Sequence, residues 1–188
     1  RGLGDVYKRQ FTNSAPVKVN GTLNAKGGTF TGTVEFKGSS IANISGGSFT
    51  SDRRHGGVMF FNSSVTGTIS GGTFAFADFY TTKVKLSGGT FEQIVSHESN
   101  NLADLLAEGA AYYDQSGNAI SNSGVAKLNN VTVKTHAHTV DAQTGSCSGC
   151  HRQMAASLTV GGTTSWYTAF ATAIEAANAA DGEKTITL

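Results

Sequence analysis

A short motif of two glycines, a hydroxyl residue and a phenylalanine recurs in the first half of this chain and constrains its fold more than any other feature. The four copies read KGGTF, SGGSF, SGGTF and SGGTF, and they occupy residues 26–30, 45–49, 70–74 and 87–91. Their first glycines stand at 27, 46, 71 and 88, so the steps between copies are 19, 25 and 17 residues. Steps of about 20 residues lie at the short end of the range for solenoid repeats. The motif therefore predicts stacked turns of one repeating unit.

Each position of the motif has a physical use in such a turn. Glycine reaches positive φ at little cost, and its missing side chain lets a neighbouring rung lie close. The hydroxyl residue can satisfy backbone groups at the bend, while the phenylalanine points inward and stacks on its counterparts in adjacent rungs. An apolar residue also stands two places before each glycine pair, as in Ile44 and Ile69. We predict that the motif marks the same corner of successive turns, with these structural residues: Gly27, Gly28, Phe30, Gly46, Gly47, Phe49, Gly71, Gly72, Phe74, Gly88, Gly89 and Phe91.

The composition agrees with a strand-rich fold that has many tight bends. Charged residues make up 14% of the chain, and it contains 24 glycines but one proline. About 25% charged residues is usual in globular proteins, and a disordered chain would need a high net charge and few aromatic residues. The net charge is +1 and no basic stripe is present, which argues against a nucleic-acid partner. No transmembrane segment is predicted.

After the last motif the pattern changes. NNLADLLAEG at 100–109 predicts a short amphipathic helix, which is well placed to cap the open end of the solenoid. Residues 112–120 predict a hairpin about a Ser-Gly-Asn turn, and residues 127–134 predict a strand. From residue 156 onward the order of patterns is strand, strand, helix and strand, with Phe170, Ile174 and Ala177 on one helix face. The second half therefore predicts a smaller α+β module.

The GG[ST]F copies, LADLLAEGAAYYDQSGNAI, the HxH and CxxC pairs and the segment from SLTVGG to TITL together resemble large repetitive surface proteins of Gram-positive gut bacteria. The resemblance covers nearly all of residues 11–188. It implies a right-handed parallel β-helix, similar in shape to the pectin-lyase superfold, in an exported or wall-attached protein that acts in adhesion. It also implies an extracellular or cell-wall location, with glycans or surface proteins of a host or of other microbes as partners.

We expect four segments. Residues 5–10, DVYKRQ, resemble a translated sequencing adapter, so residues 1–10 are predicted not to belong to the fold. Residues 11–120 would form the solenoid with its capping helix and hairpin. Residues 121–155 would form a strand and a His-Cys knuckle, and residues 156–188 would begin a further β/α/β module that is truncated at Leu188.

Two histidines and two cysteines form the best chemical constellation in the sequence. His136 and His138 stand at alternating positions and would face the same side of a strand, and Cys147 and Cys150 would form a tight knuckle after a loop of eight residues. This spacing is compatible with a closed, tetrahedral structural zinc site, and zinc is the one cofactor that the sequence indicates. A disulfide between the cysteines, or reduced cysteines beside exposed histidines, are the alternatives.

No catalytic residues are predicted. Asp52-Arg53-Arg54-His55 could be compared with the arginine and carboxylate clusters of β-helix lyases, but solvated loop charges explain it better. The scattered Glu35, Asp78 and Glu92 give no carboxylate pair of the kind that a glycosidase needs. Phe79 and Tyr80 are candidates for exposed aromatic contacts.

The sequence therefore favours a non-enzymatic fragment of a secreted or cell-surface β-solenoid protein that acts in adhesion or in contact with glycans or proteins. Two alternatives stay open, because fold alone does not decide function. One is an accessory or catalytic part of a polysaccharide-active enzyme, either a lyase or a glycosidase. The other is a passive structural stalk.

Overall fold

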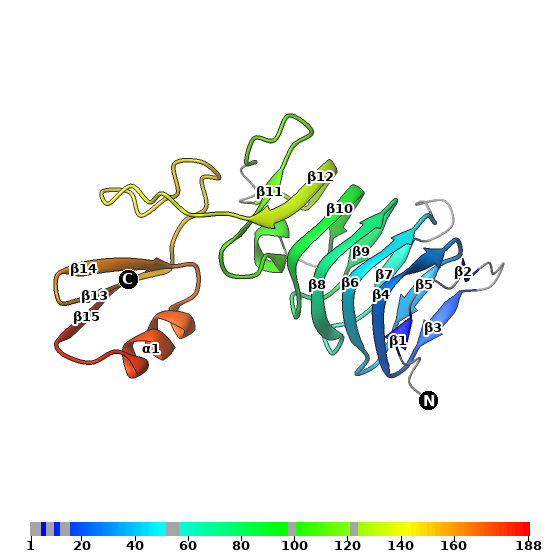
Figure 1. Cartoon of the computed structure of the whole chain (residues 1–188), viewed down its shortest axis with the longest axis horizontal. Coiled ribbons are helices and arrows are strands. Elements are labelled where there is room, and N and C mark those ends of the chain that lie inside the picture. Colours follow the sequence, from blue (N-terminus) through cyan, green and yellow to red (C-terminus); the bar gives the residue numbers. More distant parts are fainter. Residues whose placement is uncertain (1–4, 7–9, 12–15, 52–56, 98–100, 121–123) are drawn as a thin grey trace. The chain divides into compact units, whose positions relative to one another are not determined.

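The computed structural model describes residues 5–6, 10–11, 16–51, 57–97, 101–120 and 124–188 (Figure 1). The chain forms two compact units, Arg1–His136 and Ala137–Leu188. Parallel strands dominate the first unit. The second unit contains a small antiparallel sheet and the one α-helix among the described residues. Within the described residues, no helix combines the length and the apolar character needed to span a membrane.

The first unit is a β-solenoid of about four turns, as the repeat predicts. Each turn contributes one long and one short strand, and strands of the same kind pair in parallel from turn to turn. The long face consists of β4 (Thr22–Phe30), β6 (Ile41–Phe49), β8 (Thr66–Phe74) and the first part of β10 (Val84–Ser96). The short face consists of β3 (Val17–Val19), β5 (Val34–Phe36), β7 (Val58–Phe60), β9 (Ala77–Phe79) and the last part of β10. Two further short strands, β1 (Asp5–Val6) and β2 (Gln10–Phe11), pair in parallel with β4.

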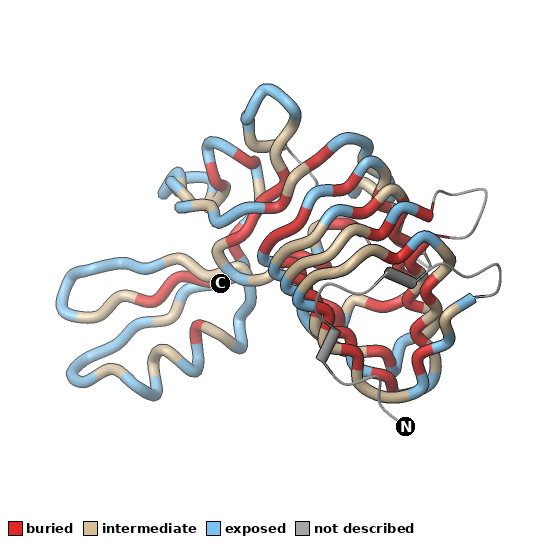
Figure 2. Tube along the Cα trace, turned by 45° about the vertical axis from the view of Figure 1, so that its right-hand side comes forward, coloured by how far each residue is buried: buried red, intermediate tan, exposed pale blue. Residues whose placement is uncertain are grey.

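The phenylalanines of the repeat form a continuous stack inside the solenoid. Phe30, Phe49, Phe74 and Phe91 pair in register on neighbouring strands, and each side chain is at most 1% exposed. Successive ring centroids lie 4.5, 4.8 and 4.8 Å apart, with interplanar angles of 7°, 2° and 10°. Buried segments line the successive turns of the tube in Figure 2. No single turn could bury its ring alone, so stacking creates the core.

The two glycines of each motif have different tasks. At Gly71 an added Cβ would lie 2.5 Å from the carbonyl oxygen of Ser45 on the adjacent strand, so only a residue without a side chain fits. The second glycine, Gly72, has a φ of +101°, which disfavours other residues. The pair lies inside one continuous nine-residue strand, and strand pairing shifts register there, as at a β-bulge.

A second aromatic stack on the short face was missed in the sequence. Phe36, Phe60 and Phe79 pair in register, are completely buried, and stack with centroid distances of 5.0 and 4.4 Å. Their signal is only a phenylalanine at the end of the three-residue strands VEF, VMF and ADF. Phe79 is therefore a core residue, and the interpretation of this side chain as an exposed contact was wrong.

The end of the solenoid is closed by irregular and antiparallel structure. The predicted amphipathic helix is a single 3-10 turn, η2 (Leu102–Leu105), which begins with a capping box formed by Asn101 and Asp104. Four residues suffice to bury Leu102 and Leu105 in the solenoid core. The hairpin follows as β11 (Ala110–Tyr113) and its turn, and β12 (Lys127–Thr135) pairs antiparallel with both β11 and β10. β12 thus covers the edge that the last turn would otherwise expose.

The second unit has the predicted order of elements. These are β13 (Ala156–Val160), β14 (Thr163–Tyr167), α1 (Phe170–Ala179) and β15 (Lys184–Thr187), with β13 in the centre of an antiparallel sheet. Within α1 the small Ala173 is buried, whereas the side chains of Phe170 and Ile174 are 44% and 38% exposed. The helix face predicted from Phe170 and Ile174 is therefore not the buried one.

We expect Gly71→Ala to destabilise the solenoid, because the new methyl group would collide with the carbonyl oxygen of Ser45 and force the strands apart. Overpacking of this kind costs about 1–3 kcal/mol. Urea unfolding followed by circular dichroism measures the loss. The exposed neighbour Ser70 offers a matched control, since Ser70→Ala should change the unfolding free energy by less than about 0.5 kcal/mol. Equal stability of the two variants would contradict the steric role of Gly71.

Candidate metal centre

The four residues predicted as metal ligands lie together. The ligand atoms of His136, His138, Cys147 and Cys150 all lie within 4.8 Å of one another. Tetrahedral zinc with bonds of about 2.0–2.3 Å to nitrogen and sulfur would require ligand atoms about 3.3–3.8 Å apart. Both cysteines are buried and both histidines are partly buried. The cluster is therefore compatible with a zinc site after a contraction of about 1 Å.

The histidines reach the cluster by a route that the sequence did not predict. β12 ends at Thr135, so His136 and His138 follow the strand instead of alternating within it. The backbone N–H of His136 donates to the carbonyl oxygen of Gly109 at 2.8 Å. The first histidine is thus tied to the loop before β11 by its backbone.

The side chain of His136 has a partner of its own. The hydroxyl oxygen of Tyr113, the last residue of β11, lies 2.7 Å from Nδ1 of His136. The two rings meet edge to face, with centroids 5.9 Å apart. Tyr113 was not singled out in the sequence, because the contact depends on the pairing of β11 with β12, which brings Tyr113 close to His136, 23 positions later and just after the end of β12.

The cysteines form a tight knuckle, as predicted. The N–H of Cys147 donates to the carbonyl oxygen of Arg152, and the N–H of His151 donates to the carbonyl oxygen of Cys147, both at 2.9 Å. His151 has a φ of +55°, and an antiparallel bridge joins Ser146 to Gln153. These bonds turn the chain sharply between the two thiols. The knuckle therefore presents both sulfur atoms to one side.

The loop between the pairs is shaped by Asp141. Its Oδ1 accepts hydrogen bonds from the backbone N–H groups of Thr144 at 2.8 Å and Gln143 at 2.9 Å. These bonds hold the pKa of the Asp141 carboxyl below its usual value. The N–H of Gly145 also donates to the carbonyl oxygen of Asp141. An Asx-type turn thus returns the chain from the histidines to the cysteines.

The contact between His138 and Cys150 already has the dimensions of a ligand pair, since Nδ1 lies 3.6 Å from Sγ. Burial raises the pKa of the Cys150 thiol, and the neighbouring Cys147 raises it further. No disulfide joins Cys147 and Cys150 in the structure. Thiolate is the form that binds metals, so a cation would have to displace protons from this site.

The other candidate chemistry of the sequence does not assemble into a site among the described residues. Asp52-Arg53-Arg54-His55 lies outside them. Glu35 forms an ion pair with Lys37 at 2.9 Å, and the buried carboxylate of Asp78 lies 2.7 Å from Nε2 of His97. Glu92 is exposed and stands in β10 between the stretch that pairs with β8 and the stretch that pairs with β9.

Tyr80 belongs to a third ring stack, which runs along the outside of the turns. Its ring lies 6.0 Å from that of Phe61 and 4.3 Å from that of His97, and the Lys37 ammonium lies 4.7 Å from the centroid of Phe61. Stacking covers both faces of the Tyr80 ring. The side chain is therefore half-buried and offers a ligand only its edge.

Comparison with protein-family models, with curated proteins and with solved structures finds no match to this chain.

Proposed function

We propose that this chain is a non-enzymatic part of an exported, surface-displayed β-solenoid protein, in which the solenoid provides a contact surface and a zinc ion holds the His-Cys cluster together. The observation that carries the first part is the in-register pairing of the turns on both sides of the glycine pair, which repeats outward residue positions such as Ser48, Thr73 and Thr90 from strand to strand. The observation that carries the second part is the convergence of two imidazoles and two thiols.

The zinc proposal is favoured by the small apolar core of the second unit. Its buried hydrophobic residues are few and mostly small: Cys147, Cys150, Met154, Ala156, Leu158 and Ala173. Domains with so little apolar surface to bury commonly depend on a metal or on disulfides. A Cys2His2 set fills all four tetrahedral positions, so the ion would have no open site for catalysis. Its task would be structural.

Metal analysis of the purified chain tests this proposal. We expect about one zinc per chain, and Co²⁺ in its place should produce the absorption bands of tetrahedral cobalt with thiolate ligands. Cys150→Ser should lose the metal, whereas Ser148→Ala, in the same knuckle but without a ligand atom in the cluster, should keep it. Substoichiometric zinc in the unaltered chain contradicts the proposal. Absence of free thiols before reduction would instead identify a disulfide.

Tyr113 provides a sharper test of the cluster. If Nε2 of His136 binds the metal, Nδ1–H donates to the Tyr113 hydroxyl and fixes the ring. Outer-shell partners of this kind typically change metal affinity by about 10- to 100-fold. We expect Tyr113→Phe to weaken zinc binding by this factor in a chelator competition, while Tyr80→Phe, which removes a hydroxyl elsewhere in the first unit, leaves it unchanged. Equal affinities of the two variants would exclude the outer-shell role.

The contact proposal is supported by periodicity and by the placement of the acids. Each turn adds one more copy of the same outward position, so weak contacts can be multiplied along the solenoid and again by the number of displayed chains. Among the acids that the sequence singled out in the solenoid, Glu35 pairs with Lys37 and Asp78 pairs with His97. The described residues show no pairing of Glu92 with a second carboxylate. A glycosidase needs two carboxylates about one bond. This arrangement favours contact over catalysis.

An array of glycans and surface proteins, probed with the chain immobilised on beads, separates the proposal from its alternatives. We expect the beads to bind a subset of the array and to release no reducing or unsaturated sugar from the polysaccharides that they bind. A passive stalk would bind nothing. An enzyme would release products.

A further inference from the structure

The long face of the solenoid carries a row of hydroxyl side chains that crosses five neighbouring strands. The row is formed by the third position of each motif and continues onto β12: Thr29, Ser48, Thr73, Thr90 and Thr132. Its members are Cα partners on adjacent strands, and their spacing follows the ring stack beneath them, which repeats every 4.5–4.8 Å. Thr73 and Thr90 are exposed. The face thus presents hydroxyls at a constant repeat.

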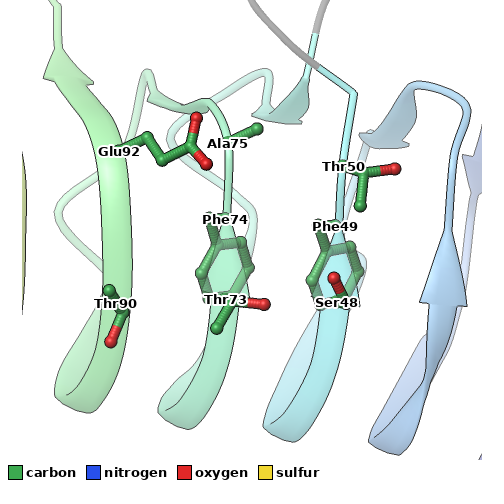
Figure 3. A pocket seen from close by; sticks show the side chains of 8 residues that line it. All are labelled: Ser48, Phe49, Thr50, Thr73, Phe74, Ala75, Thr90 and Glu92. Carbon is green, nitrogen blue, oxygen red and sulfur yellow. The ribbon is translucent and has the colours of Figure 1, made fainter.

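A hollow of about 310 Å³ lies along this row, between β6, β8 and β10. Figure 3 shows Ser48, Thr73 and Thr90 at one level of the three strands, with the carboxylate of Glu92 leaning toward Ala75 at the next level. Because the side chain of Ala75 is only a methyl group, it leaves room for the carboxylate of Glu92. The volume lies at the lower end of the range for small-ligand sites, about 300–1,000 Å³.

We propose that this hollow and its hydroxyl row bind a linear glycan that carries no negative charge. The row matches a polymer that offers a hydroxyl-bearing unit at each rung, since a pyranose residue in an extended, β-linked chain advances by a length close to one strand spacing. Hydroxyl groups both donate and accept hydrogen bonds, so Ser48 and Thr73 can pair with sugar hydroxyls in either direction. This inference rests on the proposed contact function and names its ligand class and its site.

Charge selects among glycans. None of the residues that line the hollow is basic, and Glu92 is the single charged group among them. A carboxylate accepts strong hydrogen bonds from sugar hydroxyls, whereas it repels the carboxylates of uronate chains. Neutral chains are therefore favoured over acidic ones.

The test uses the full chain and three soluble probes: cellohexaose, chitohexaose and hexagalacturonate. Saturation-transfer NMR and competition titrations detect the weak affinities expected for contacts made by hydroxyl groups. We expect at least one neutral hexasaccharide to bind, and hexagalacturonate to bind at least about tenfold more weakly. Glu92→Gln should weaken the neutral ligand about fivefold to tenfold, because a hydrogen bond to a neutral amide replaces one to a charged group. It should also reduce the discrimination against hexagalacturonate.

A Thr73→Val/Thr90→Val double variant removes two hydroxyls and keeps the β-branched shape, so the strands should remain folded. We expect it to weaken the neutral ligand at least tenfold. The matched controls are Thr68→Val, exposed on β8 outside the hollow, and Glu183→Gln, exposed in the second unit; both should bind as the unaltered chain does.

Failures of the site and of the proposed function can be told apart. Neutral glycan binding that survives Glu92→Gln and the double threonine variant unchanged overturns this site and leaves the contact function intact. Tighter binding of hexagalacturonate than of either neutral probe overturns the charge argument and hence the site. Absence of binding to all three probes overturns the site as well, and the bead array then decides whether the chain contacts any surface ligand at all.

Discussion

The structure of the first unit depends on the in-register, parallel pairing of successive turns. Because strands repeat at one spacing, a side chain that points inward from one turn must lie on its equivalent in the next. Phenylalanine satisfies this condition well, since offset or parallel rings can stack at that distance. The Phe74 ring, for example, has a partner 4.8 Å away on each side. The backbone register and the ring stack therefore reinforce each other, and a slip of one residue would lose both.

The bulge at the glycine pair follows from the same constraint. Gly71 allows the backbone of one turn to approach the Ser45 carbonyl of the preceding turn, and the positive φ of Gly72 restores the strand direction, so that the next residue points outward and Phe74 inward. The hydroxyl residue faces solvent because it stands between a glycine that cannot project and a phenylalanine that must be buried. The outward row and the inward stack are thus two consequences of one local geometry.

The repeat made the solenoid and its stacked phenylalanines predictable, and the HxH and CxxC pairs made the His-Cys cluster predictable, because each depends on spacing that is visible in the sequence. The rest depends on pairing that spacing does not reveal. The Phe36–Phe60–Phe79 stack rests on strands of three residues, too short for periodicity to identify. The spacing of the leucines at 102 and 105 predicted a helix. In the structure a single 3-10 turn packs on the last turn of the solenoid and is long enough to bury both side chains. Tyr113 became a partner of His136 only through a hairpin pairing.

Periodicity also separates the two candidate sites. Any recognition by the long face must use residues that recur with the turns, so a ligand either repeats along the solenoid or contacts a single rung weakly. The hydroxyl row meets the first condition, and Glu92, which occurs once, limits which repeating ligand fits. Among the described residues, the His-Cys cluster has no counterpart in the turns of the solenoid, and its residues come from a knuckle and from the segment after a strand end rather than from the repeat. A unique site with four soft or borderline ligands suits one ion, whereas a row of hydroxyls suits a polymer.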